Sequence, residues 1–489
     1  MTAVATPTAA GPATASTTQG SEPLRIAIVA GESSGDQLGA ALITAMRARV
    51  PNVQFFGMAG PKMIAAGCDA WAHSEEIAVM GLAEVLPHLP RLIRLRASLV
   101  ARFRAARPHV FVGIDSPAFN LGLAKQLRSA DCKTVQYVAP QVWAWRQGRV
   151  KGIRKACDLV LCLLPFETDF FERHGIRAPF VGHPLADQIP LEVDRGAARS
   201  LLGLDPTASI VAILPGSRLG EIERLGTDFV RAAQYIAQRR PEIRFVSPMA
   251  SARVRNAFER KMAEVPNAPE IRRYDGHAQQ VLAAADAVIV ASGTASLETL
   301  LSRRPMVVAY RWGAVTAFVL RALGLVKVQF FSQPNLLAGR LLVPELLQEQ
   351  VSGESLGAAL LRVLDDRELR AEMDREFLKI HETMRRNGAD LAATAILNCI
   401  SGEPDSHGPS GAPVESAAPG TSAAPGESNA HGPSAAPGTS TAPGESNAHG
   451  PSAAPGTSAA PGEPNAHGPS AAPGTSTAPG ESNAPRGAP

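Results

Sequence analysis

The sequence predicts an α/β protein with two consecutive domains, each an open parallel sheet covered by helices. From about residue 24 to residue 310, short β-branched runs alternate with amphipathic segments of helix length, which is the pattern of repeated strand-helix-strand units. The pattern stops between residues 182 and 205, a stretch interrupted by X-Pro pairs. Because two sheets of ordinary size are commoner than one of about ten strands, we predict domains over 23–185 and 186–400.

Each predicted element follows from its own apolar run. In the first domain the runs predict strands over 24–30, 53–57, 110–114, 134–138 and 159–162. Helices are expected over 36–49, 90–107, 117–129, 146–156 and 167–174. In the second domain we expect strands over 210–214, 243–247, 287–291 and 306–310. Its helices are expected over 219–239, 250–264, 277–285, 294–303, 314–323 and 355–400. Ligands of such folds bind at the carboxyl ends of the strands, so the loops after strands are where chemistry is expected.

The two ends of the chain differ in composition from the rest. Residues 1–22 are small and polar and lack the apolar block of a secretory signal, so a disordered leader is expected. Residues 401–489 repeat an 18-residue unit near GESNAHGPSAAPGTSTAP. Stacked units would bury nothing, because the unit contains no Leu, Ile, Val or Phe, and a disordered tail is expected.

Charge separates the tail from the globular part. The tail has seven acidic residues and one arginine, so the chain's formal charge of +3 leaves about +9 on the remainder. A basic globular part favours phosphorylated substrates, acidic lipid or nucleic acid, although solubility alone explains it equally well. The basic residues lie beside apolar segments without interleaved aromatics, which argues against nucleic acid.

Cysteine usage and hydropathy favour a soluble protein of the cytoplasm. The five cysteines lack CxxC spacing and lie mostly in or beside apolar runs, as reduced core residues do. No cluster of metal ligands is evident. The best apolar run, 315–328, is broken by Arg321 and falls short of the roughly 18–20 residues that span a membrane.

Two loops after strands of the first domain carry candidate groups. The loop GESSGD, with Glu32 and Ser34, fits neither the dinucleotide nor the P-loop pattern, and it is either an anion-binding turn or a capped helix start. In GIDSPAFN, Asp115 follows an apolar strand and Asn120 lies one turn into the next helix. Asp115 is a candidate general base, but taken alone a helix cap is the better interpretation.

A third loop contains two tryptophans, Trp143 and Trp145, followed by Arg146 and further basic residues. Rings in such a loop stack on sugars or line an acyl channel. The alternative is an ordinary solvated basic face.

The second domain has two loops suited to phosphate. LPGSR places Arg218 after a glycine turn, and the guanidinium fork suits phosphate oxygens. In ASGTASLETL, the small residues Ser292, Gly293 and Thr294 open a helix whose free amides suit a diphosphate. Glu298, one helical turn further on, is placed to hold a ribose diol.

Two further segments complete the candidate residues. Asn335 lies in a polar loop, SQPNLLAGR, and is predicted to close on the nucleotide from the side. The apolar stretch 77–87 precedes a run of arginines, a combination found at membrane surfaces and equally in a core helix followed by a solvated one. Its membrane-facing candidates are Val79, Met80, Leu82 and Leu86.

Together these segments resemble the lipid-A-disaccharide synthase family, which are bacterial glycosyltransferases of the two-domain GT-B type. The strings that carry the resemblance are VAGESSGDQLGA, EEIAVMGLAEVL, VFVGIDSPAFN, YVAPQVWAWRQGRV, LPGSR, ASGTASLETL and PNLLAGR. They occur in order over about residues 24–400, and the leader and the tail lie outside them.

The resemblance implies a specific reaction without a metal or other cofactor. Such an enzyme transfers 2,3-diacylglucosamine from its UDP donor to 2,3-diacylglucosamine 1-phosphate with inversion, giving the β-1,6 disaccharide and UDP. Asp115, or else Glu32, would act as base, while Arg218 and the amides near Thr294 stabilise the leaving UDP. It also implies peripheral association with the inner-membrane phospholipid, as a monomer or homodimer. The rivals are another GT-B enzyme, such as a UDP-sugar epimerase, or a non-catalytic protein that binds nucleotide sugars.

Overall fold

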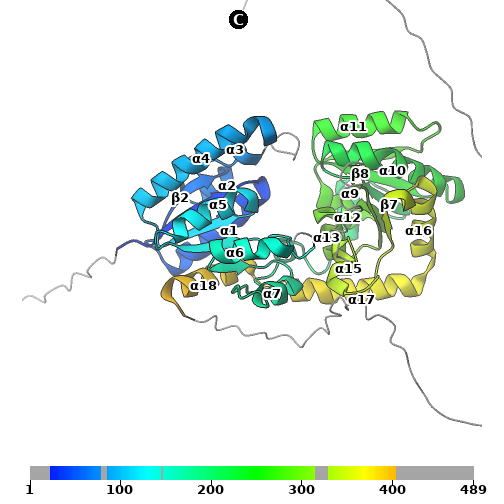
Figure 1. The fold of residues 1–489 in the computed structure, drawn as a ribbon. Coiled ribbons are helices and arrows are strands. Elements are labelled where there is room, and N and C mark those ends of the chain that lie inside the picture. The colour runs from blue at the N-terminus through cyan, green and yellow to red at the C-terminus, as the bar shows by residue number, and fades with distance from the viewer. Residues whose placement is uncertain (1–21, 79–84, 145–146, 314–328, 404–489) are drawn as a thin grey trace, which may run out of the picture. The chain divides into compact units, whose positions relative to one another are not determined.

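The computed structural model describes residues 22–78, 85–144, 147–313 and 329–403 (Figure 1). Within them the chain forms two six-stranded sheets in which every neighbouring pair of strands is parallel. The first has the order β3-β2-β1-β4-β5-β6 and the second β12-β11-β10-β7-β8-β9. The predicted leader and tail, and the predicted helix over 314–323, lie outside the described residues.

The first sheet is built by the amino-terminal half of the chain. Its strands are β1 (Arg25–Ala30), β2 (Gln54–Ala59), β3 (Cys68–His73), β4 (Val110–Ile114), β5 (Lys133–Tyr137) and β6 (Leu159–Leu161). Its helices are α1 (Ser33–Arg49), α2 (Pro61–Ala65), α3 (Glu75–Ala78), α4 (Val85–Ala106), α5 (Pro117–Arg128), the 3-10 turn η1 (Gln147–Arg149), α6 (Val150–Ala156) and α7 (Pro165–Glu172).

The apolar side chains of β1 alternate between two helical layers, as the two-residue period of a strand requires. Ile26 and Ile28 face a core formed with α1 and with α18 (Gly388–Ser401), the last helix described. Ala27 and Val29 face a second core formed with α4, α5 and α6. The sheet is therefore buried on both faces, which explains why its central strands are continuous apolar runs.

The second sheet follows two short helices, α8 (Pro184–Gln188) and α9 (Arg195–Leu201). Its strands are β7 (Ile210–Leu214), β8 (Arg244–Met249), β9 (Ile271–Asp275), β10 (Ala287–Ala291), β11 (Met306–Tyr310) and β12 (Glu345–Leu347). Its helices are α10 (Leu219–Arg239), α11 (Ala252–Ala263), α12 (Ala278–Ala284), α13 (Thr294–Leu301), α15 (Gln333–Ala338), the 3-10 turn η2 (Gln348–Gln350), α16 (Gly353–Asp365) and α17 (Arg367–Met384).

The two segments that cross between the sheets are hydrogen-bonded to each other. The amide of His183 donates to the carbonyl of Met384 (3.0 Å). The carboxylate of Asp187 accepts the amides of Asn387 (2.9 Å) and Gly388 (2.7 Å), so it caps α18 across about 200 residues of sequence. This pairing returns α18 to the first sheet.

All nine predicted strands are present within a few residues of their predicted bounds, and the three that the prediction missed are edge strands. β3 and β9 read CDAWAH and IRRYD and are only partly buried, so they lack a continuous apolar run. The single helix predicted over 355–400 is wrong, because the structure has three helices there. Asp366 caps α17 by accepting the amide of Leu369 (2.9 Å), and Asn387 takes a left-handed conformation before α18.

The five cysteines are all buried in the two cores, as predicted. Burial raises the pKa of Cys68, Cys132 and Cys157 to about 12, so these thiols stay protonated at neutral pH. Among the described helices, none combines the length and the apolar character needed to cross a membrane.

Gly57 in β2 gives a direct test of this packing. Its φ is +146°, and an added Cβ would lie 2.1 Å from the backbone carbonyl oxygen of Ile28 in β1. We expect Gly57→Ala to lower the free energy of unfolding by about 2 kcal/mol or more, measured by denaturant unfolding. Gly148→Ala is the matched control, because a Cβ there meets nothing within 4 Å. Equal stability of the two variants would contradict the expectation.

Candidate functional site

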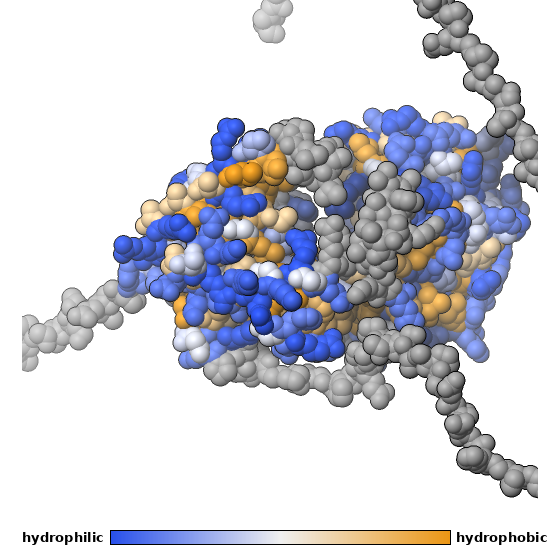
Figure 2. Space-filling view, viewed as in Figure 1, coloured by the Kyte–Doolittle hydropathy of each residue, from blue (hydrophilic) through white to orange (hydrophobic). Residues whose placement is uncertain are grey.

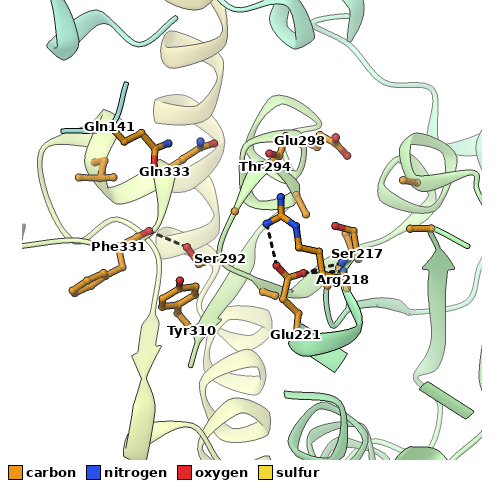
Figure 3. Close-up of a pocket in the computed structure, with 18 of the residues that line it drawn as sticks. Gln141, Ser217, Arg218, Glu221, Ser292, Thr294, Glu298, Tyr310, Phe331 and Gln333 are labelled. Atoms are coloured by element: carbon orange, nitrogen blue, oxygen red, sulfur yellow. Dashed lines mark hydrogen bonds and ion pairs between the residues drawn. The ribbon is translucent and has the colours of Figure 1, made fainter. Parts of the chain in front are cut away.

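A cavity of about 900 Å³ lies at the carboxyl ends of β7, β8, β10 and β11 (Figure 3). The loops after these strands contribute most of its wall, as the rule for parallel sheets predicts. Gln141 and Trp143, from the loop after β5 of the first sheet, line it as well. Of the candidates named from sequence, it gathers Arg218, Ser292, Gly293, Thr294, Glu298 and Trp143.

The loop after β7 is organised by Glu221, a residue that the sequence analysis did not single out. Gly216 has a φ of +128°, and an added Cβ would lie 2.4 Å from the Glu221 carboxylate. That carboxylate accepts the amides of Ser217 (2.9 Å) and Arg218 (3.3 Å). The two amides just before α10 are therefore occupied by an internal anion. The Arg218 side chain is 78% exposed, 3.7 Å from Glu221, and borders the cavity (Figure 3).

In the turn after β10, one residue fixes the backbone and the next two are exposed to the cavity. The Ser292 amide donates to the carbonyl of Ala309 (2.8 Å), and its hydroxyl donates to the carbonyl of Phe331 (2.8 Å). Ser292 therefore fixes the turn. Gly293, with a φ of +150°, and Thr294 are exposed at the start of α13, where first-turn amides have no acceptor within the helix and the helix dipole favours an anion.

An aromatic wall and a carboxylate complete this cavity. Trp312 contacts both Tyr310 and Phe331 edge to face, with ring centroids 5.0 and 5.1 Å apart. Tyr310 ends β11 and Trp312 follows it, so the carboxyl-end rule could have identified both from sequence. Glu298 lies on α13 and lines the cavity, and burial raises the pKa of its carboxyl.

Asn335 does not line this cavity, although its neighbours do. It is fully buried. Its side-chain oxygen accepts the amides of Leu342 (2.8 Å) and Val343 (2.9 Å), and its nitrogen donates to Val343 (3.1 Å) and Glu345 (3.0 Å). The amide is thus used within the loop, and its neighbours Gln333 and Leu336 line the cavity instead.

Asp115 borders a second cavity of about 620 Å³, which shares Gln141 with the first. Its backbone is strained, since Asp115 and Ser116 have φ values of +49° and +35°. The fully buried Asn120 donates to the carbonyls of Ile114 and Asp115 (both 3.0 Å), and Gln136 donates to that of Asp115 (2.9 Å). These bonds hold the turn in a conformation that a free chain avoids.

The Asp115 carboxylate is desolvated. One oxygen accepts the amide of Gly31 (3.1 Å), and the other is buried without a hydrogen-bond partner among the described residues. A Cβ at Gly35 would lie 2.0 Å from this carboxylate, so the GESSGD glycines make room for it. Burial raises the pKa of Asp115 to about 7, and the charge of Glu32 adds to the rise.

The other residues of the GESSGD loop have different positions. Glu32 and Ser34 are exposed at the start of α1, and the Glu32 side chain makes no capping bond. Asp36, the last residue of this loop, does not cap its own helix. Its carboxylate accepts the amides of Lys62 and Met63 (both 2.9 Å) and so caps α2.

The tryptophan loop is anchored by a buried acid. The Trp143 indole donates to Glu167 (3.2 Å) and meets Phe166 edge to face at 4.8 Å. Glu167 also accepts the amide of Leu164 (3.1 Å), and burial raises its pKa to about 7. Trp145 and Arg146 lie outside the described residues.

Most of the membrane-facing candidates fall where the structure gives no description. Val79, Met80 and Leu82 lie outside the described residues, and the side chain of Leu86 in α4 does too. The same helix exposes Leu89 (43%) and Ile93 (54%), four residues apart and therefore on one side. Figure 2 shows hydrophobic surface along this helix.

The buried carboxyl of Asp115 has a measurable consequence for stability. Its pKa is 3.8 when solvated and about 7 in the fold, so the folded chain keeps a proton that the unfolded chain releases between those values. The wild-type protein therefore loses stability as pH rises through this window and no further above 7. We expect Asp115→Asn to melt at a higher temperature than wild type, with the advantage growing from pH 5 to pH 8.

The control for that experiment is Asp36→Asn. Because the Asp36 carboxylate accepts two amides, this variant should be less stable than wild type at both pH values. An Asp115→Asn advantage that does not change with pH would contradict the assignment of the raised pKa.

Solved structures with low sequence identity share this fold. The UDP-GlcNAc 2-epimerase of Neisseria meningitidis, solved with UDP-GlcNAc, aligns over 78% of this chain and 100% of its own, with a TM-score of 0.53 and 8% identity. The glycotransferase of kitacinnamycin aligns over 78% and 100%, with a TM-score of 0.51 and 17% identity. The predicted fold class, two Rossmann-like domains of the GT-B type, is confirmed.

Sequence comparison is more specific. The family model for lipid-A-disaccharide synthetase matches residues 26–396. The lipid-A-disaccharide synthase of Alkalilimnicola ehrlichii is 47% identical over 381 residues, covering 78% of this chain and 99% of the relative. That of Pseudomonas aeruginosa strain UCBPP-PA14 is 49% identical over 377 residues, covering 77% and 98%. The family resemblance predicted from the motifs is confirmed, and the chain belongs to the lipid-A-disaccharide synthase family of glycosyltransferases.

Proposed function

We propose that this enzyme transfers 2,3-diacylglucosamine from UDP-2,3-diacylglucosamine to 2,3-diacylglucosamine 1-phosphate, giving the β-1,6-linked disaccharide 1-phosphate and UDP. One observation carries the proposal beyond family membership. The cavity lined by the anion-binding turn and the cavity lined by the desolvated Asp115 share Gln141 as a common wall residue. A donor in the first and an acceptor in the second would therefore meet at that residue.

Asp115 serves as the general base. It takes the proton from the acceptor 6-hydroxyl, and the oxygen forms a bond to C1 of the donor sugar. The bond from C1 to the β-phosphate oxygen breaks on the opposite side, and its electron pair leaves with UDP, so the anomeric centre inverts. A pKa of about 7 suits this role, because the base is largely ionised and still a good proton acceptor near neutral pH. Glu32 is the second candidate, since it is exposed at the adjoining helix start.

The leaving UDP is stabilised by fixed positive charge. The sequence has no Asp-x-Asp motif to hold a cation on the diphosphate. The exposed Arg218 guanidinium and the first amides of α13, at Gly293 and Thr294, supply the charge instead. We therefore propose a metal-independent reaction. Within the described ranges, the Arg218 guanidinium is paired only with Glu221, at 3.7 Å, so one weak ion pair is exchanged when a diphosphate binds.

The remaining wall holds the nucleoside. Glu298 is placed one helical turn from the phosphate turn, where its carboxylate accepts the ribose hydroxyls. The aromatic wall formed by Tyr310, Trp312 and Phe331 lines the same cavity and offers rings to the uracil. Asn335 acts indirectly, because its buried amide fixes the loop that carries Gln333 and Leu336.

The decisive assay incubates the purified full chain with both lipid substrates, without added metal, and measures disaccharide and UDP. We expect equal amounts of the two products, and Asp115→Ala should lower turnover by about 10²–10⁴-fold while UDP binding stays near normal. In wild type, turnover should also fall below about pH 7 as the base becomes protonated. UDP released without disaccharide would contradict the proposed transfer, and near-normal turnover of the variant would remove Asp115 from the role of base.

We further propose that the enzyme reaches its lipid substrates by docking on an anionic phospholipid surface through α4. Leu89 and Ile93 are exposed on this helix beside arginines, and burying such side chains in lipid is favourable. We expect Leu89→Gln with Ile93→Gln to weaken binding to anionic vesicles by about tenfold or more in a sedimentation assay. Leu201→Gln, on α9 and 65% exposed, is the control. Unchanged vesicle binding in the α4 variant would refute the docking role.

A further inference from the structure

The second cavity is a groove between two helices that carries two cations. One face of α5, with Pro117, Leu121 and Lys125 spaced four residues apart, forms one wall. The opposite wall is formed by Arg149, Gly152 and Ile153 at the start of α6. Among the groove residues that the structure describes, the charged ones are Asp115, Lys125 and Arg149.

Neither cation has a counter-ion among the residues that the structure describes. Across the described parts of the chain, no carboxylate lies within ion-pair distance of Lys125 or Arg149, whereas some basic residues close to them are paired. Arg128, one turn beyond Lys125 on α5, pairs with Asp158 at 2.8 Å, and Arg91 on α4 pairs with Glu76 at 3.1 Å. Two unpaired cations facing one groove raise the local concentration of anions.

The groove leads from the cations to the proposed base. Asp115 and Ser116 come directly before α5, so Asp115 lies at one end of the helix. Lys125 lies eight residues after Pro117, about 12 Å further along the axis. An occupant that presents a hydroxyl to Asp115 would therefore meet the cations through a second group directed along α5.

We infer that Lys125 and Arg149 form the subsite for the phosphomonoester of the acceptor lipid. The inference rests on the proposed function, in which the acceptor carries a 1-phosphate on C1 and its reacting 6-hydroxyl on the carbon attached to C5, on either side of the ring oxygen. A phosphomonoester has a charge of about −1.5 to −2 at neutral pH, which two cations balance. The rest of the groove is mainly apolar, with Leu121, Val142 and Ile153 suited to acyl chains.

The position of the groove favours a lipid over free phosphate. α5 and α6 belong to the same helical layer of the first sheet as α4, which exposes Leu89 and Ile93 (Figure 1). An added Cβ at Gly152 would meet nothing within 4 Å, so this wall is open and admits a ligand of some width. The subsite thus selects acceptor molecules that carry a phosphate and orients their free hydroxyl toward Asp115.

The test compares two variants of the full chain in detergent micelles. Lys125→Gln with Arg149→Gln removes the subsite charges, and Lys151→Gln with Lys155→Gln is the control. The control residues lie on α6 and are outside the groove lining. Each protein is assayed with 2,3-diacylglucosamine 1-phosphate and with the same monosaccharide lacking phosphate, and UDP binding is measured separately.

We expect the subsite variant to have a KM for the phosphorylated acceptor raised about 100-fold, roughly tenfold for each lost charge-assisted contact. Its KM for the unphosphorylated acceptor and its affinity for UDP should stay at the wild-type values. An equal rise for both acceptors, the same rise in the control variant, or an unchanged KM would overturn the subsite. So would weaker binding to anionic vesicles with an unchanged acceptor KM, which would indicate membrane docking instead.

Direct binding separates failure of this inference from failure of the proposed function. If wild type makes no disaccharide but binds the phosphorylated monosaccharide, and only the subsite variant loses that binding, the proposed transfer fails and the subsite stands. If disaccharide forms at the same rate in wild type and the subsite variant over a range of acceptor concentrations, the transfer stands and the subsite fails.

Discussion

The hydrogen bond from the Gly31 amide to the Asp115 carboxylate joins the carboxyl ends of β1 and β4, at the edge of the sheet where chemistry is expected. It requires a carboxylate to lie over the start of α1, and only glycine at position 35 leaves room for it. It also requires Asp115 and Ser116 to adopt positive φ values, which Asn120 and Gln136 stabilise by donating to the carbonyl of Asp115. Several features of the first domain thus serve the placement of one acid.

The position of Asp115 lowers the stability of the fold and, in the proposed reaction, suits the carboxylate to act as a base. A desolvated carboxylate with one unpartnered oxygen destabilises the folded state when it ionises. The same desolvation gives the group a pKa near neutrality, where a proton acceptor is most effective. At Asp115, local strain and an unsatisfied carboxylate oxygen occur together in the lining of a cavity, as they do at many functional sites.

The second domain presents positively charged and amide groups to its cavity. In the proposed reaction its site attracts a diphosphate, yet the amides of Ser217 and Arg218, just before α10, are already held by the Glu221 carboxylate. The amides that begin α13 border the cavity, where Ser292 fixes the turn through its bonds to Ala309 and Phe331. Glu221 keeps the loop after β7 rigid and leaves the exposed guanidinium of Arg218 close to the cavity. The loops after β7 and β10 both contain glycine, and they therefore present different groups to the cavity: a guanidinium in the first and helix amides in the second.

The sequence by itself determined the fold class, the central strands and the family, because continuous apolar runs and long motifs are local properties of the chain. It also placed Arg218, Ser292 and Asp115 in loops after strands, since parallel sheets bring those loops to one edge. It did not predict the edge strands β3, β9 and β12, whose partial burial leaves no strong apolar pattern. It gave Asn335 a direct contact with the nucleotide, whereas burial uses all of its hydrogen-bonding capacity inside the loop.

Only the tertiary structure decided which acids are desolvated and which cations are unpaired. Asp36 and Asp115 look alike in sequence, but one accepts two amides of α2 while the other keeps a buried oxygen without a partner among the described residues. Lys125 and Arg149 are 24 residues apart and share no motif, and they line one groove because α5 and α6 lie side by side. Burial and charge pairing depend on neighbours distant in the chain, and for that reason the sequence could name candidate groups but not their environments.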